Sequence, residues 1–200
     1  IIFVGEGKGG DTLEPFFQTL KRKRVNLEAV AIDMGKAYIA AMCKYLPQTP
    51  IVFDHFHVVK LINSKLDKFR RQAVDEAERL GIPAQKGQRW SILKNPENLT
   101  DKQRGLLDQL LLLNTPLAQA YLLKEQFRSF WTLPSKAEAE SFLNTWLAEL
   151  RSIGSHIMNT LAKTIKAYSF GLLNYFDHPI SSGLMEGLNN KIRTMNRQAY

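Results

Sequence analysis

The organisation of this chain can be worked out from Ala29-Val-Ala-Ile-Asp33-Met34, an apolar run that ends on a carboxylate. Such a short apolar run bounded by polar residues is typical of a buried strand. Similar runs occur on both sides of it, at Ile1–Val4 and Ile51–Phe53, and segments with helical spacing separate the three. Because strands that alternate with helices form parallel sheets, we expect a largely parallel α/β region here.

Beyond Val58 the apolar residues recur almost entirely at helical spacing, so the predicted structure is helix rather than strand. The expected helices cover 58–80, 101–113, 116–130, 135–150, 153–175 and about 184–196. Capping boxes are predicted at Thr100–Gln103 and Ser135–Glu138. Two apolar groups are expected in the core, Trp90 with Ile92 and Leu93, and a leucine stripe at positions 106, 107, 110, 111 and 113.

The fold class that follows is α/β plus an all-α insertion. We expect an α/β core over 1–57, a helical insertion over 58–178, and a closing helix within 179–200 that returns to the core. The chain begins within an apolar run that looks like the middle of a strand, and it ends without a residue pattern that would stop the last helix. We therefore expect it to be a piece of a longer protein.

Composition restricts the class of protein. The chain has 200 residues, 44% hydrophobic, with a formal net charge of +8, which favours a polyanionic partner such as nucleic acid. Its single cysteine, Cys43, excludes an internal disulfide and favours a reducing compartment such as the cytoplasm. No apolar run reaches the roughly 20 residues of a membrane span, and no signal peptide is visible.

Two acidic residues far apart in sequence suggest a metal site. Asp33 ends a predicted strand, and the carboxyl ends of strands in open α/β sheets are where ligands bind. Glu186 lies at the start of the last predicted helix. Carboxylates from two such places would hold Mg²⁺ for phosphodiester chemistry. The alternative is that Asp33 caps the following helix and Glu186 complements a helix dipole.

The segment Asp54-His-Phe-His57 follows the next predicted strand in the same manner. Its spacing is not that of a zinc site, and no second Cys/His pair follows. We interpret Asp54 and His57 as supporting residues that orient Asp33 or contact DNA. A capped helix with a buried His57 is the alternative.

Glycines and cations suggest further contacts with phosphates. The run Gly5–Gly10 has neither the Walker A order nor a complete dinucleotide fingerprint, so a flexible loop near DNA is favoured over a nucleotide site. Trp131, Trp146 and Tyr168 are interpreted as core residues rather than base-stacking platforms. Besides the basic run Lys21–Arg24 and the lysines at positions 65 and 68, the candidates for DNA-backbone contact are Lys60, Arg70, Arg71, Asn190, Lys191, Arg193 and Arg197.

Three parts of the sequence have the pattern of a known family. The first part comprises Ala31-Ile-Asp33-Met, Tyr38, Leu46-Pro47 and Ile51-Val-Phe-Asp54-His-Phe-His57-Val. The second comprises Leu93-Lys94, Leu99-Thr100 and Ala120-Tyr-Leu-Leu-Lys-Glu-Gln-Phe127. The third comprises Ser181-Ser-Gly-Leu-Met-Glu186-Gly-Leu-Asn-Asn-Lys-Ile-Arg193 and Arg197-Gln-Ala-Tyr200. Together these parts resemble the DDE transposases of the bacterial ISL3 group.

This resemblance implies a partial RNase H-like core of about three parallel-type strands, interrupted by a helical domain. It implies a DDE triad with two Mg²⁺ or Mn²⁺ ions, in which Asp33 is the second Asp and Glu186 the Glu. The stretch Asp54–His57 resembles the family's Asp-x-x-His signature. The first Asp is expected upstream of Ile1, so the fragment alone should be inactive. Implied partners are double-stranded DNA, at transposon ends and target, and further copies of the protein, in a nucleoid-associated setting with no membrane.

Two other classes of function remain open from the sequence. The same scaffold is compatible with a Mg²⁺-dependent, structure-selective nuclease that performs no strand transfer. It is also compatible with a non-catalytic helical DNA-binding or interaction module, in which the acids serve only as caps.

Overall fold

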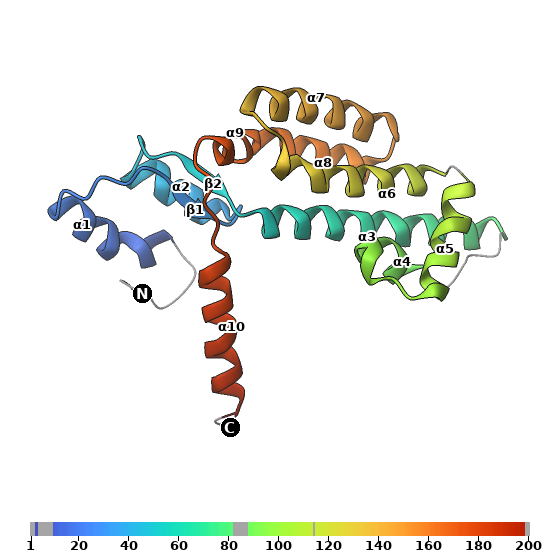
Figure 1. The fold of residues 1–200 in the computed structure, drawn as a ribbon, viewed down its shortest axis with the longest axis horizontal. Helices are drawn as coiled ribbons and strands as arrows, with labels where there is room; N and C mark the ends of the chain where they lie inside the picture. Colours follow the sequence, from blue (N-terminus) through green and yellow to red (C-terminus); the bar gives the residue numbers. More distant parts are fainter. Residues whose placement is uncertain (1–2, 4–9, 82–87, 114, 199–200) are drawn as a thin grey trace. The chain divides into compact units, whose positions relative to one another are not determined.

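The computed structural model describes residues 3, 10–81, 88–113 and 115–198 (Figure 1). It divides into two compact units, each considered separately below. The first comprises Ile1–Val58 and Tyr168–Tyr200, and the second comprises Val59–Ala167. The described residues are mostly helical, with a small parallel sheet. None of the helices in these ranges is long and apolar enough to cross a bilayer.

The first unit is built around two short strands. Its elements are η1 (Gly10–Leu13), α1 (Glu14–Arg22), β1 (Val30–Ile32), α2 (Lys36–Tyr45), β2 (Ile51–Phe53), α9 (Ser169–Leu173), η4 (Asn174–Phe176) and α10 (Gly183–Gln198). Strands β1 and β2 pair in parallel, which confirms the parallel arrangement predicted for this region. The predicted strand at Ile1–Val4 lies, except for Phe3, outside the described residues, as does most of Gly5–Gly10.

Strand β2 is the buried centre of this unit. Its three residues are all buried, and the ring of Phe53 has no exposed surface. Tyr168 and Phe170 place their rings edge-on to Phe53, both with centroids 5.3 Å away. The Asn174 side-chain amide donates to the Ile51 carbonyl at 3.0 Å. The segment that begins at Tyr168 therefore packs along β2, although more than a hundred residues separate them in sequence.

The second unit is helical throughout its described part. It contains most of α3 (His55–Arg79), then α4 (Arg89–Leu93), η2 (Pro96–Asn98), α5 (Asp101–Leu112), α6 (Pro116–Phe127), η3 (Arg128–Thr132), α7 (Lys136–Ser152) and α8 (His156–Ala167). Helices α6, α7 and α8 lie side by side (Figure 1). Trp146 of α7 is 1% exposed, and its indole N–H donates to the Leu123 carbonyl of α6 at 2.8 Å. A buried indole needs such a partner, so this bond fixes how α6 and α7 pack.

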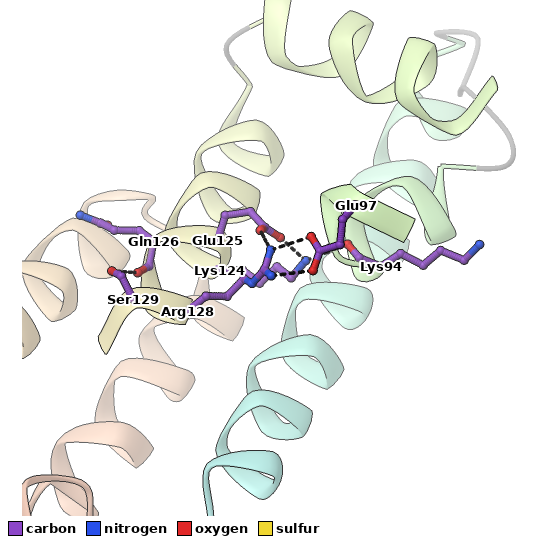
Figure 2. A network of polar contacts seen from close by, with 7 residues as sticks. All are labelled: Lys94, Glu97, Lys124, Glu125, Gln126, Arg128 and Ser129. Carbon is purple, nitrogen blue, oxygen red and sulfur yellow. Dashed lines mark hydrogen bonds and ion pairs between the residues drawn. The ribbon is translucent and has the colours of Figure 1, made fainter. Parts of the chain in front are cut away.

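A network of charged side chains joins α6 and the start of η3 to Lys94 and η2 within the second unit (Figure 2). Lys124 is only 4% exposed; its ammonium donates to the Lys94 carbonyl at 3.1 Å and pairs with Glu125. Arg128 pairs with Glu125 at 2.9 Å and with Glu97 at 2.8 Å. Because a buried ammonium is tolerated only when it is paired, this network compensates the charge of Lys124.

Helix starts agree with the local sequence signals. Thr100 and Gln103 form the complete capping box predicted for α5. At α7 the Ser135 hydroxyl accepts a hydrogen bond from the Glu138 backbone N–H at 3.2 Å, as an N-cap does. Trp146 is in the core, as predicted.

Three structural predictions were wrong. Trp90 is 50% exposed rather than a buried anchor, with the Arg89 guanidinium over its ring, although Ile92 is buried. Leu113 is 66% exposed and lies beyond the end of α5 at Leu112, so it is not part of the buried stripe. The helix expected over 153–175 is broken: α8 ends at Ala167, and α9 and η4 follow in the first unit, against β2.

Candidate active site

The carboxyl edge of the sheet carries two aspartates. In the register of the parallel pair, Ile32 lies opposite Phe53, so Asp33 and Asp54 are the next residues on neighbouring strands. The Asp54 N–H donates to the Ile32 carbonyl at 3.0 Å, which extends the pairing to this point. Because neighbouring strands lie only about 4.8 Å apart, both aspartates belong to one edge. The structure thus brings together two residues that the sequence places 21 positions apart.

Asp33 is half-buried and is not the cap of the helix that follows. Its Oδ1 accepts a hydrogen bond from the Gly35 N–H at 3.2 Å. Gly35 itself is the N-cap residue of α2, and that cap position makes no side-chain hydrogen bond. Within the described part of the chain, the hydrogen bond to the Asp33 side chain is to Oδ1, and none is made to Oδ2.

Gly35 keeps the space beside Asp33 narrow. A Cβ at position 35 would lie 3.0 Å from Asp33 Oδ1 and 3.0 Å from the ring of Tyr38. Such contacts are tighter than ordinary van der Waals packing, so a larger residue would displace the carboxylate or the ring. Glycine at this position allows the Asp33 carboxylate to fold back onto the turn.

Asp54 differs from Asp33 in that both of its carboxylate oxygens accept hydrogen bonds. The residue is 1% exposed. Its Oδ1 accepts from the Phe56 N–H at 2.8 Å, in the first turn of α3. Its Oδ2 accepts from the Ser182 N–H at 2.7 Å and from the Ser182 hydroxyl. Asp54 thus binds donors at the starts of two helices, α3 and α10.

These donors explain why a buried carboxylate stays ionised. Burial by itself raises the pKa of Asp54, but the hydrogen bonds from Ser182 and Phe56, with a smaller contribution from the charge of His55, more than offset it. The net result is a pKa below the ordinary value for aspartate. The unpaired backbone N–H groups at a helix N-terminus likewise favour a negative charge nearby.

His57 lies in the first turn of α3 and is half-buried. Its backbone N–H donates to the Asp54 carbonyl at 3.1 Å, and its ring stands edge-on to Phe56 with centroids 5.4 Å apart. Its Nδ1 is buried without a hydrogen-bond partner among the described residues. Nor do those residues contain any group of three or more His, Cys, Asp or Glu side chains able to hold a metal. The bond from the Phe56 N–H to Asp54 is that of a capped helix. The role of Asp54 and His57 in orienting Asp33 or contacting DNA stays a prediction.

The closing segment returns to this edge through Ser182. Helix α10 begins at Gly183, directly after Ser182, and Glu186 lies in its first turn. The side chain of Glu186 is outside the described part of the structure, so its distance from Asp33 stays a prediction. Ser182 is the residue that sequence reasoning missed. A pair of serines just before a helix start was the available signal, since serine is a favoured N-terminal residue.

The candidate DNA-contacting residues fall into two groups, one in each unit. In the second unit Lys60 is exposed, and Arg71 is 63% exposed. Arg70 is only 15% exposed, and its guanidinium binds Asp67 at 3.0 Å. In α10 of the first unit the exposed candidates are Asn190, Lys191 and Arg197, whereas the side chain of Arg193 is outside the described part.

Comparison with known proteins adds what the geometry does not supply. The family model DDE_Tnp_ISL3, described as a transposase, matches residues 1–200. The chain belongs to the ISL3 transposase family. It is 35% identical over 207 residues to the transposase for insertion sequence element IS1001 of Bordetella parapertussis, covering all of this chain and 50% of that protein. It is 27% identical over 224 residues to the transposase for insertion sequence element IS1557 of Mycobacterium tuberculosis, with the same coverage.

Membership of this family confirms the resemblance seen in the sequence. The chain spans about half the length of the curated relatives that it matches. No solved structure matches it. The assignment of individual residues to catalytic roles therefore depends on the geometry described above.

Proposed function

We propose that this chain is the greater part of the catalytic domain of an insertion-sequence transposase. The sheet and its helices would form part of an RNase H-like core, and the helical unit would be an insertion into it. The reaction is DNA cleavage at the ends of the element followed by strand transfer to target DNA. The observation that supports this best is the bond from Ser182 to Asp54, because it returns the Glu186 segment to the edge where Asp33 stands.

Asp33 fits the role of a metal ligand. It is half-buried at the carboxyl end of a strand, and its Oδ2 accepts no hydrogen bond within the described residues. Carboxylate oxygen is the ligand type that Mg²⁺ and Mn²⁺ prefer. Glu186 is the proposed second ligand, and the family's remaining Asp is proposed to lie outside this chain. When bound, a pair of such ions activates the attacking hydroxyl and stabilises the departing oxygen.

The chain's own residues have three tasks in this proposal. Asp33 and Glu186 present carboxylates to one point at the edge of the sheet. Asp54 supports the backbone on which Glu186 is carried. Exposed cations hold the DNA, because phosphate neutralisation supplies most of the affinity of such complexes. Of the seven candidates, Lys60, Arg71, Lys191 and Arg197 are exposed cations, whereas Arg70 is occupied by Asp67.

The proposal is tested in the full-length protein with Asp33→Asn and Glu186→Gln. Each substitution removes a charge with little change in volume, so cleavage of element-end DNA should fall by at least about a thousandfold while DNA binding remains. Glu28→Gln is the matched control, since Glu28 is exposed and lies shortly before β1. Cleavage that survives either of the first two substitutions contradicts the proposal.

Two other functions can be distinguished from this one, by the products of the reaction and by the effect of the substitutions. A structure-selective nuclease would cleave DNA but would not join a 3′-hydroxyl end to target DNA. A non-catalytic helical module would show no change on substitution of Asp33 or Glu186. Assembly of several copies on the element ends is part of the proposal and is measured by the mass of the protein–DNA complex.

A further inference from the structure

We infer that the contact between Asp54 and Ser182 positions the first turn of α10, so that Asp54 and Ser182 are positioning residues for Glu186. This inference rests on the proposed function, since it concerns how a proposed metal ligand is held. It assigns to Asp54 a role that differs from metal binding or DNA contact.

The burial and hydrogen bonding of the Asp54 carboxylate support this assignment. Asp54 is 1% exposed, and three donors fill its two oxygens. A carboxylate in this state has little capacity left for a metal ion. Its remaining function is mechanical: it fixes the start of α3 through the Phe56 N–H and the start of α10 through Ser182.

The position of Ser182 in the chain makes the contact effective. Ser182 immediately precedes Gly183, the first residue of α10, and Glu186 follows four residues later. One helical turn is about 3.6 residues, so a fixed Ser182 fixes the backbone of Glu186 once the helix is formed. Both the N–H and the hydroxyl of Ser182 donate to one oxygen, which restrains the residue in two directions.

The base of this contact is itself rigid. Asp54 directly follows the fully buried Phe53, and its backbone N–H is bonded to the Ile32 carbonyl of β1. Upstream in the closing segment, the Asn174 side chain is bonded to the Ile51 carbonyl. The segment from Asn174 to Ser182 is therefore attached to β2 at Asn174 and to Asp54, the residue after β2, at Ser182. A side chain that orients a metal ligand is effective only when its own support is fixed in this way.

The test compares Ser182→Ala, Ser182→Thr and Ser181→Ala in the full-length protein. Ser182→Ala removes the hydroxyl donor, and Ser182→Thr retains it. Ser181 is exposed, and its hydroxyl accepts from the Gly183 N–H at 3.5 Å, a long contact that does not involve Asp54, so it is the matched control. The rate of element-end cleavage is measured against Mg²⁺ concentration, and DNA affinity is measured separately in each variant.

For Ser182→Ala we expect the half-saturating Mg²⁺ concentration to rise about tenfold, the lower range for losing a residue that orients a metal ligand. DNA affinity should remain within about twofold, because no DNA-contacting residue is changed. Ser182→Thr should restore most of the Mg²⁺ dependence, and Ser181→Ala should match the unsubstituted protein. Asp54→Asn should produce a larger rise than Ser182→Ala, because it also removes the negative charge.

An unchanged Mg²⁺ dependence in Ser182→Ala overturns the inference, as does an equal rise in Ser181→Ala. Glu186→Gln separates this failure from that of the proposed function. If Glu186→Gln abolishes cleavage while Ser182→Ala leaves the Mg²⁺ dependence unchanged, the positioning role is wrong and the proposed function stands. If Glu186→Gln still cleaves, both are wrong.

Discussion

Gly171 lies so close to the ring of Phe53 that a Cβ atom at position 171 would overlap two of the ring's carbon atoms. The ring has no exposed surface, and Tyr168 and Phe170 pack edge-on against it. It therefore has little room to move. The close approach of α9 to β2 therefore requires a residue without a Cβ atom at position 171.

Gly171→Ala should destabilise the protein by about 1–3 kcal/mol, as overpacking of a filled core does. Alanine favours helix over glycine by nearly 1 kcal/mol, so a net loss means that the overlap dominates. Gly105→Ala in α5 is the control, because nothing lies within 4 Å of a Cβ there. That variant should gain stability. Chemical denaturation of both variants tests the contact, and a Gly171→Ala protein as stable as Gly105→Ala would contradict it.

The stability contributed by Asp54 should depend on pH in the acid range. Its folded-state pKa lies below the ordinary value of 3.8, so its ionised form favours the folded state. The contribution is fully present above pH 3.8 and is lost as the pH falls through the lower, folded-state pKa. The free energy of unfolding of the protein and of Asp54→Asn should thus differ most near neutral pH and converge on acidification. Urea titrations between about pH 2.5 and pH 7 measure this difference; a constant gap would contradict it.

Local signals in the sequence were sufficient for much of the fold. The run that ends at Asp33 and the run before Asp54 are both strands, and α2 lies in the segment with helical spacing between them. The capping box at Thr100 is present because it depends on four consecutive residues alone. These features are decided within a few residues, which is the range that periodicity and capping rules describe.

Features that depend on residues far apart in the chain could not be predicted from local sequence patterns. Helical spacing continues past Ala167, yet α8 ends there, and the residues that follow pack on the ring of Phe53, more than a hundred residues earlier. Trp90 is exposed although its neighbour Ile92 is buried, because apolar character alone does not say which side of a short helix meets the core. At the candidate site, Asp33 and Asp54 were identified, but the partner of Asp54 was not, since Ser182 is 128 residues away.

Lys124 should be a sensitive position in the second unit. Lys124→Met removes the ammonium that binds the Lys94 carbonyl and Glu125; the carbonyl then lacks this donor, whereas Glu125 keeps its ion pair with Arg128. We expect a loss of about 1–3 kcal/mol, because a buried acceptor loses its hydrogen bond. Lys163→Met, at an exposed position of α8, should change stability by less than about 0.5 kcal/mol. Thermal unfolding compares the two variants, and equal melting temperatures would show that the network contributes little.

Arg70 and Arg71 are neighbours with different expected roles in DNA binding. Arg71 is 63% exposed, and its Nε makes two long contacts with Asp67, at 3.4 Å to the carbonyl and 3.5 Å to the carboxylate. Its guanidinium can therefore turn toward a phosphate. Arg70 is 15% exposed and binds Asp67 through two nitrogens, at 3.1 and 3.0 Å. If α3 contacts the DNA backbone, Arg71→Gln should weaken binding to all sequences alike and reduce the salt dependence of the affinity by about one ion.

Arg70→Gln should instead lower stability and leave the salt dependence nearly unchanged, since its charge is already neutralised by Asp67. Affinities for element-end DNA and for unrelated DNA, measured at several salt concentrations, distinguish the two variants. An effect of Arg70→Gln on the salt dependence as large as that of Arg71→Gln would mean that the ion pair with Asp67 opens when DNA binds. If neither substitution changes the DNA affinity or its salt dependence, this face of α3 is not part of the proposed DNA interface.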